Sequence, residues 1–479
     1  MIIEILVLLG MLTGGSALVR AVGIHGWALP GLGFITGVAL TAIIGTFQIV
    51  TPLPTWPILT IVLATFAPIL FWAVRLYQGY DVRIRIFPAL ITGLFVAFTT
   101  FILWQIHLVN WHTDTFFNIE SAALISQGQF EEARFAGLTK RLTAIPVIHS
   151  LASLSGEYYL RAFAPLLSLS TIVSLLWVFV KGTARKVKTV PALLYGAGAV
   201  LLLVTNSRYI FNSFYVNGHL LFAALLIIIV GAAWLLASRT NLPRSGLVAI
   251  QTVAASALVF VRPEAAIFAG LALLPMLVSK HIQFKHKAIP LAALGISTIA
   301  WQAFVLSRYI DAGSSIPDDV YAMLVYGAIL LVAIPFLKLR LIQNYSQYVL
   351  GIAEIGLWVS LVFFTISDPL NLTKSLNAMF YNFVMGSGSW GWSLIMLAAL
   401  FGVVLLFKRF SQQVYIRFAI TTFLPMSLIL GYLRGGGYRV GDGDSFNRMM
   451  IHIVPVTVLF IVLAAALGEN RIKKKNNNS

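Results

Sequence analysis

Residues 88–120 join an apolar run, PALITGLFVAFTTFILWQIH (residues 88–107), to a polar stretch, WHTDTFFNIE (residues 111–120). The apolar run matches the ~20 residues that a helix needs to cross the hydrocarbon core of a bilayer. The polar stretch opens a loop over residues 109–160 that contains no long apolar run. The sequence therefore predicts a membrane-spanning helix followed by a long loop on the water side, in which Asp114 is the first acidic residue.

Apolar runs of this kind recur along the whole chain. Of its 479 residues, 59% are hydrophobic and 10% are charged, and the mean hydropathy is +0.90. Soluble domains carry about 25% charged residues. We therefore predict an all-α fold, a polytopic transmembrane helical bundle of about 13 to 15 spans.

The predicted spans have ends that are uncertain by a few residues. They lie at 2–19, 28–50, 56–76, 88–108, 161–180, 190–205, 217–237, 246–261, 264–279, 289–307, 319–337, 347–366, 391–407, 416–433 and 449–467. The pair around Arg262-Pro263-Glu264 is either two short spans that meet at the outer surface or one broken helix. The first run contains Glu4 and reads as a span rather than as a removed signal peptide.

The net charge of +17 has two readings, nucleic-acid binding or the positive-inside bias of membrane proteins. Sorting the loops between the predicted spans favours the second, because one side holds 22 of the 33 Lys and Arg residues and the other holds most of the acids. This bias predicts a plasma or inner membrane protein with its N-terminus outside, its C-terminus in the cytoplasm and the Asp114 loop outside. No nucleic-acid partner is expected.

The basic residues of the predicted outer side are mostly arginines, nine against the two lysines Lys140 and Lys374. Guanidinium is a rigid fork that suits phosphate oxygens, whereas ammonium is a hydrated point charge. The bias fits phosphate binding at the outer membrane edge, or an avoidance of lysine imposed by export.

Several protein classes lack their signatures here. The chain has no cysteine, which excludes disulfides and thiolate metal sites. It has no Walker A motif and no His-Glu-x-x-His zinc motif. The two halves show no inverted repeat of broken helices, which disfavours a secondary transporter.

The long loop predicts two short interfacial helices separated by a turn, one over 115–126 and one over 144–154. Asp114 lies beside the first helix among aromatic residues. There it can act as a general base, or Thr113 or Asp114 can serve as the N-cap of that helix. Glu120 and His149 are further polar candidates of the same loop.

Other polar concentrations lie at the predicted outer ends of spans. A short loop carries Arg208 and His219. The pair Arg262 and Glu264 interrupts an apolar stretch, where charges are usually paired or functional. These four are candidate substrate-binding residues, and a structural role is open for each.

The late outer loop, residues 434–448, is rich in glycine, which lets backbone N–H groups approach an anion. Arg439 and Arg448 supply guanidinium groups, and Arg448 either grips a phosphate or extends to lipid headgroups. Asp442 and Asp444 form an Asp-x-Asp pair that can hold a divalent cation. No other cofactor is expected.

From Pro88 to Leu467 the chain resembles the GT-C class of membrane glycosyltransferases. Trp111-His-Thr-Asp114-Thr-Phe-Phe-Asn is similar to the acidic site in the first long outer loop of that class. Arg262-Pro-Glu264-Ala is similar to its basic-Pro/x-Glu-Gly/Ala segment, and the stretch from Ser445 to Pro455 to its Arg-containing start of a late span. Where the class has a Tyr-Ala-Asp-like run, this chain has Tyr215-Val-Asn217.

The resemblance implies an inverting glycosyltransferase with a polyprenyl-phosphate sugar as donor and a glycan, lipid or protein as acceptor, in contact with membrane lipid. It implies that Asp114 deprotonates the acceptor hydroxyl while arginines, Arg448 and Arg439 first, hold the phosphate. It implies a three-span extension at 1–87, a core at 88–280 and a C-terminal module at 281–479. The alternatives are a flippase or transporter of lipid-linked precursors, and a polysaccharide polymerase or ligase.

Overall fold

A computed structural model describes residues 2–51, 56–78, 94–95, 97–99, 101, 113–129, 142–157, 159–184, 186–238, 240–433 and 436–470. Most of the predicted span at 88–108 lies outside the described residues. So do Trp111, His112, Lys140 and Arg434.

The described chain is almost entirely helical, which confirms the all-α prediction. Its helices in the first half are α1 (Ile2–Ala21), α2 (Leu29–Val50), α3 (Trp56–Tyr77), α5 (Thr113–Ser126), α8 (Ala144–Ser150), the 3-10 helix η2 (Leu151–Ser155), α9 (Phe163–Thr183), α10 (Thr189–Val204), α11 (Ser207–Asn212), α12 (Gly218–Ala237) and α13 (Arg244–Leu258). They continue with α14 (Ala265–Leu277), α15 (Phe284–Asp311), α16 (Asp318–Phe336), α17 (Arg340–Asn344), α18 (Ser346–Ser367), α19 (Pro369–Phe383), α20 (Ser393–Phe407), α21 (Val414–Leu433), α22 (Ser445–Met449), the 3-10 helix η3 (Met450–His452) and α23 (Val454–Leu467). Strands β1 (Lys408–Arg409) and β2 (Glu469–Asn470) form one antiparallel pair.

Within the described residues, nine helices are long and apolar enough to cross a membrane. The pair Ser445–His452 and Val454–Leu467, bent by 41°, is either a broken tenth span or a re-entrant loop. The chain is thus a multi-pass membrane protein by the length and composition of its helices. The spans predicted at 190–205, 264–279 and 391–407 appear as the shorter apolar helices α10, α14 and α20. The span predicted at 246–261 appears as α13, a helix of 15 residues that is not among the candidate spans. The two helices expected in the long loop are α5 and α8 with η2.

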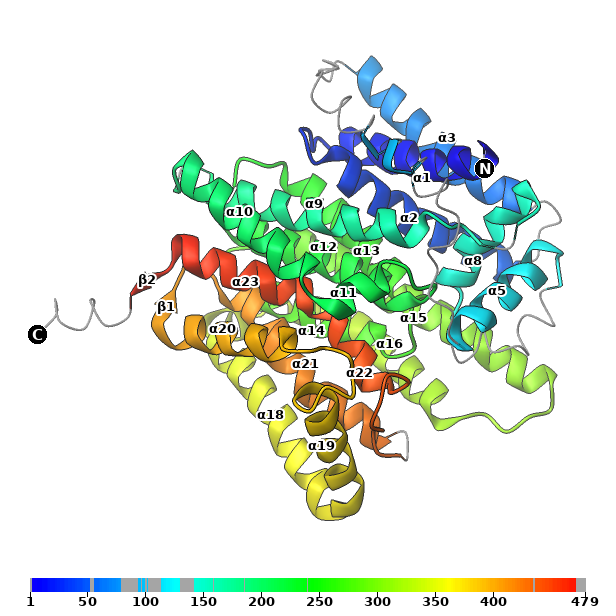
Figure 1. Cartoon of the computed structure of the whole chain (residues 1–479). Helices are drawn as coiled ribbons and strands as arrows, with labels where there is room; N and C mark the ends of the chain where they lie inside the picture. The colour runs from blue at the N-terminus through cyan, green and yellow to red at the C-terminus, as the bar shows by residue number, and fades with distance from the viewer. Residues whose placement is uncertain are drawn as a thin grey trace, which may run out of the picture.

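Helix α12 forms the centre of the bundle (Figure 1). All of its residues are buried, which fits a sequence that is apolar on every face. It packs against α9, α13, α14 and α23. The first polar groups of its N-terminal end, Asn217 and His219, are therefore held in a rigid frame.

The first three helices attach to this core through α2, which packs on α8, α9 and α13. Helices α1 and α2 cross closely because Gly15 and Gly37 have no side chain. A Cβ added at either position would overlap a carbonyl of the facing helix. Glu4, fully buried, accepts from Arg161 Nη2 at 3.0 Å and fixes α1 against the end of the long loop.

The C-terminal helices α16 and α18 are less buried than the central helices. Helices α18 and α19 project from the bundle (Figure 1), and α16 and α18 expose rows of large apolar side chains, as surfaces in contact with lipid do. Glu354 of α18 accepts two hydrogen bonds from Arg417 of α21, at 2.7 and 2.8 Å. The acid inside the span predicted at 347–366 is therefore paired.

Two helix breaks bring polar residues to one end of the bundle. The chain leaves α13 at Leu258 and enters α14 at Ala265, so Arg262-Pro263-Glu264 lies between two short helices, which fits both sequence-based alternatives. The bend between η3 and α23 follows Arg448. Both breaks lie beside α5 and the N-terminal end of α12.

Candidate functional site

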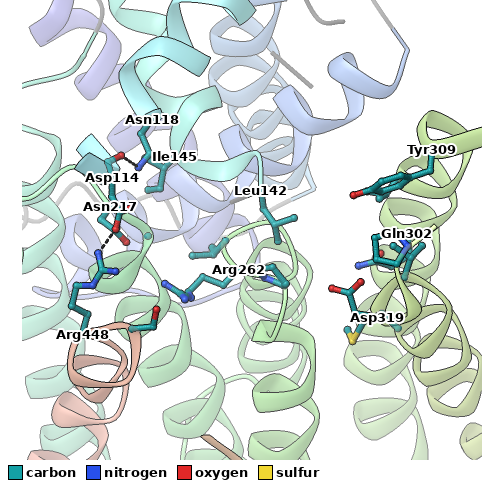
Figure 2. Close-up of a pocket in the computed structure, with 18 residues that line it drawn as sticks. Asp114, Asn118, Leu142, Ile145, Asn217, Arg262, Gln302, Tyr309, Asp319 and Arg448 are labelled. Carbon is teal, nitrogen blue, oxygen red and sulfur yellow. Dashed lines mark hydrogen bonds and ion pairs between the residues drawn. The ribbon is translucent and has the colours of Figure 1, made fainter. Parts of the chain in front are cut away.

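A cavity of about 450 Å³ lies at this end of the bundle. One wall consists of residues from α5, the turn before α12, the α13–α14 break and α22. The opposite wall consists of α15 and α16 (Figure 2). Asp114, Arg262 and Arg448 line the cavity together, although 334 residues separate the first from the last.

Asp114 lies in the first turn of α5, one residue inside the helix rather than at its N-cap. Its carboxylate forms an ion pair with Arg448, and the two side chains are 11% and 12% exposed. The same Oδ2 accepts from the Tyr215 hydroxyl at 3.1 Å and from Asn217 Nδ2 at 3.2 Å. Three donors from two other segments therefore hold one carboxylate oxygen at the cavity wall.

Arg448 is oriented by its own loop. Asp444 caps α22 by accepting from the Asn447 amide at 2.8 Å. The Arg448 guanidinium donates to the carbonyls of Asp444 (3.3 Å) and Gly443 (3.2 Å), and its Nη1 also reaches the Tyr215 hydroxyl at 3.1 Å. The guanidinium is thus fixed before any substrate arrives.

Tyr215 and Asn217 come from the turn that enters α12. Asn217 caps that helix by accepting from the His219 amide at 3.2 Å. Asn118 of α5 donates to the Val216 carbonyl at 3.2 Å and ties the turn to the helix that carries Asp114. Burial, with the Asp114 carboxylate alongside, raises the pKa of Tyr215 to about 12, so its hydroxyl stays a proton donor at neutral pH.

Arg262 lies beside this group, and its side chain is 18% exposed. Its Nε donates to Glu264 at 2.6 Å and its Nη1 contacts His219 Nε2 at 3.3 Å. Because a guanidinium only donates, a neutral His219 accepts at Nε2 and donates from Nδ1 to His452 Nε2, 2.9 Å away. Glu264 and His219, predicted as substrate-binding residues, are buried behind Arg262 and orient it.

Arg208, also predicted to bind substrate, contacts a different part of the protein. Its buried guanidinium donates to the Gly388 carbonyl and forms an ion pair with Asp442. Ser389 donates to the same carboxylate at 2.8 Å. Arg208 therefore fastens the loop before α22, which carries Asp442, to α11 and does not line the cavity.

The Asp442–Asp444 pair was the candidate for a divalent cation. Asp442 is engaged by Arg208, and Asp444 accepts from the amides of Arg439 and Asn447, both at 2.8 Å. Burial nevertheless raises the pKa of Asp444 above its ordinary value, against the effect of these hydrogen bonds. Within the described residues, no group of three or more His, Cys, Asp or Glu side chains is placed to hold a metal ion.

Three other predicted site residues do not line the cavity. The Arg439 side chain is exposed, and its backbone carries the described contacts, through the amide noted above and a carbonyl that accepts from Asn382 at 2.9 Å. His149 is buried, with Nδ1 accepting from the Leu160 amide at 3.0 Å. Glu120 is exposed on α5.

The fold brings to the site several residues that were not predicted from the sequence. Tyr215 and Asn217 lie in a short loop rich in hydrogen-bonding side chains, in which Arg208 and His219 were the predicted site residues and Tyr215-Val-Asn217 departs from the GT-C pattern. The wall of α15 and α16, with Gln302, Tyr309 and Asp319, gave no signal beyond lying at the ends of two spans. On α15 the cavity residues Gln302, Val305 and Tyr309 are three and four positions apart, a spacing that any amphipathic helix shows.

No family model, curated protein or solved structure matches this chain. A functional assignment therefore rests on the chemistry of the cavity.

Proposed function

We propose that the chain is an integral membrane glycosyltransferase that moves a sugar from a polyprenyl-phosphate donor to an acceptor hydroxyl. The observation that carries the proposal is the Asp114 carboxylate at a cavity wall, held by Arg448, Tyr215 and Asn217 and next to Arg262. A general base and guanidinium groups in one shielded pocket are what transfer from a phosphate leaving group requires.

The reaction proceeds in one displacement. Asp114 takes the proton of the acceptor hydroxyl, whose oxygen forms a bond to the anomeric carbon from the side opposite the phosphate. The bond between that carbon and the phosphate oxygen breaks, and its electron pair stays on the phosphate. The sugar changes anomeric configuration, and polyprenyl phosphate leaves with one more negative charge than it carried in the donor.

Arg448 acts both in the free protein and after the donor has bound. In the free protein its charge is balanced by the ion pair with Asp114. A donor phosphate that enters the cavity competes with Asp114 for Nη1, while Tyr215 and Asn217 still donate to the carboxylate. Phosphate binding therefore loosens the ion pair and leaves the Asp114 carboxylate available to accept the proton of the acceptor hydroxyl.

Arg262 offers the donor a second contact. Its Nε and Nη1 are engaged by Glu264 and His219, while its Nη2 has no described hydrogen bond. This nitrogen is free to donate to a phosphate oxygen. Because the phosphate gains charge as the bond breaks, contacts with the two guanidinium groups strengthen in the transition state.

A GT-C-like arrangement is part of the proposal, supported by short helices in the long loop and by Asp114 and Arg448 in one cavity. A transporter would place unpaired charges along a path through the spans, and Glu354 is instead paired with Arg417. The outward-facing orientation is supported by the loop charges alone. No described feature favours a polymerase or ligase over transfer of a single sugar.

The test is a transfer assay on the purified protein in lipid nanodiscs, with radiolabelled undecaprenyl-phosphate glucose, mannose and galactose as donors and a membrane extract as acceptor source. We expect label to move from at least one donor into an acceptor, and we expect Asp114→Asn to stop it. Transfer that survives this substitution would contradict the proposal, as would the absence of transfer from every donor.

A further inference from the structure

The wall of the cavity that faces Asp114 comes from α15 and α16. Gln302, Val305 and Tyr309 follow each other at helical spacing on one face of α15, and Asp319 lies in the first turn of α16. None of these positions takes part in the proposed proton transfer. The wall nevertheless carries three different polar side chains.

These side chains have no partner within the described part of the protein. No hydrogen bond or ion pair of the described residues involves the side chain of Gln302, Tyr309 or Asp319, although Gln302 is only 7% exposed. Figure 2 shows the Gln302 amide, the Tyr309 hydroxyl and the Asp319 carboxylate directed into the cavity, toward Arg262 and Leu142. The Gln302 amide is not among the fully buried unpartnered groups of the described residues, so it stays open to the cavity and can hydrogen-bond a ligand there.

The two walls also differ in charge. The guanidinium groups of Arg262 and Arg448 lie on one wall, and the carboxylate of Asp319 on the other. An anionic group is attracted to the first wall and repelled by the second. A phosphate-linked sugar therefore has one favourable direction, with its phosphate at the arginines and its sugar toward α15 and α16.

We propose that Gln302, Tyr309 and Asp319 form the subsite that binds the sugar of the donor through its hydroxyl groups. A carboxylate can accept from two neighbouring hydroxyls, and an amide can donate to one hydroxyl while accepting from another. The Tyr309 ring adds an apolar face and a hydroxyl. Because Asp319 is unpaired, the subsite selects a sugar without a negative charge. The assignment rests on the proposed function and names its specificity residues.

The chain offers a matched control for Asp319. Asp318 lies in the same first turn of α16, where both carboxylates face the same helix dipole, but it does not line the cavity. The change Asp318→Asn therefore reproduces any effect on the helix itself. Only Asp319→Asn and Gln302→Leu alter the proposed subsite.

The experiment measures binding to wild type and variants in nanodiscs with undecaprenyl phosphate and with undecaprenyl-phosphate glucose, mannose and galactose. We expect wild type to bind at least one sugar-bearing lipid. We expect Asp319→Asn and Gln302→Leu to weaken the binding of that lipid by roughly tenfold to a hundredfold while leaving the affinity for undecaprenyl phosphate unchanged. Asp318→Asn should change neither affinity.

Each other outcome is decisive. If the two subsite variants bind the sugar-bearing lipid as wild type does, the subsite is absent while the proposed function stands. An equal loss of affinity for undecaprenyl phosphate and for the sugar-bearing lipids would show a general disturbance of the cavity and would overturn the assignment. If wild type binds none of the lipids, the proposed function fails, and the subsite fails with it.

Discussion

Arg448 of α22 and Asp114 of α5 form an ion pair across 334 residues of sequence. Each side chain comes from a short helix, and Tyr215 donates to Asp114 and accepts from Arg448. The pair links the first long loop to the last span. A substrate that engages Arg448 therefore acts directly on Asp114.

The first prediction concerns Asp114→Asn. The amide can still accept from Tyr215, but it cannot take a proton, so sugar transfer should fall by roughly a hundredfold to ten-thousandfold. Donor affinity should stay the same or increase, because the phosphate no longer competes with a carboxylate for Arg448. Transfer rates and equilibrium binding of undecaprenyl-phosphate sugars on the same preparation measure both effects.

The control for this substitution is Glu120→Gln, which removes an exposed carboxylate from the same helix. Its transfer rate should equal that of wild type. Equal losses in the two variants would show that charge on α5, rather than Asp114, limits the reaction.

The second prediction concerns Arg448→Ala. Loss of charged hydrogen bonds to the phosphate should weaken binding of undecaprenyl phosphate by roughly tenfold to a hundredfold. Arg439→Ala is the matched control, because Arg439 belongs to the same loop and exposes its side chain. Titration of both variants with the lipid checks the assignment, and an unchanged affinity for Arg448→Ala would refute the phosphate role.

The helical bundle was predictable because its cause is local. A run of apolar residues such as Gly218–Ala237 cannot be exposed to water, and its length fits a bilayer. Pro263 between two charged residues likewise marked the break between α13 and α14. The number of full spans was harder to predict, since α10, α14 and α20 are apolar but short.

The site was predictable only in part. Asp114, Arg262 and Arg448 stood out as charges at the ends of apolar runs, and the fold brings them to one cavity. Arg208 stood out for the same reason, but it fastens a loop through an ion pair with Asp442. Such an ion pair leaves no signal in the sequence. Tyr215 owes its place to contacts with residues far away in the chain, which no spacing rule reports.

The third prediction concerns pH. The pKa of Tyr215 is raised from its ordinary value of 10.0 to about 12, mainly by burial. Between these values the folded protein keeps a proton that the unfolded chain loses, so the contribution of Tyr215 to stability decreases as the pH rises above 10. Below pH 10 the hydroxyl stays intact, and the pH profile of transfer should show no step from this group.

Tyr215→Phe tests this prediction. We expect the variant to be roughly threefold to tenfold slower, through loss of one hydrogen bond to Asp114. Its rate should run parallel to that of wild type from pH 7 to pH 10 on a logarithmic scale. An alkaline step present in wild type and missing in the variant would contradict the raised pKa.

The fourth prediction separates stability from binding. Arg208→Ala removes the donors to Gly388 and Asp442 and should lower the free energy of unfolding by about 1–3 kcal/mol. Affinity for undecaprenyl phosphate should change little at a temperature where the variant is folded. Thermal unfolding in detergent with Arg439→Ala as reference measures the first effect, and an unchanged midpoint would show that the late loop does not depend on this contact.

The fifth prediction concerns orientation in the membrane, which the loop charges place with the cavity outside. The chain contains no cysteine, so single Ser→Cys variants give labelling without background. Ser314 is exposed between α15 and α16 on the side of the cavity, and Ser411 is exposed between α20 and α21 among lysines and arginines. In intact cells, a membrane-impermeant maleimide should label Ser314→Cys and not Ser411→Cys, while both react after the cells are opened. The reverse pattern would place the cavity in the cytoplasm, where the donor and acceptor would have to be available on the inner face.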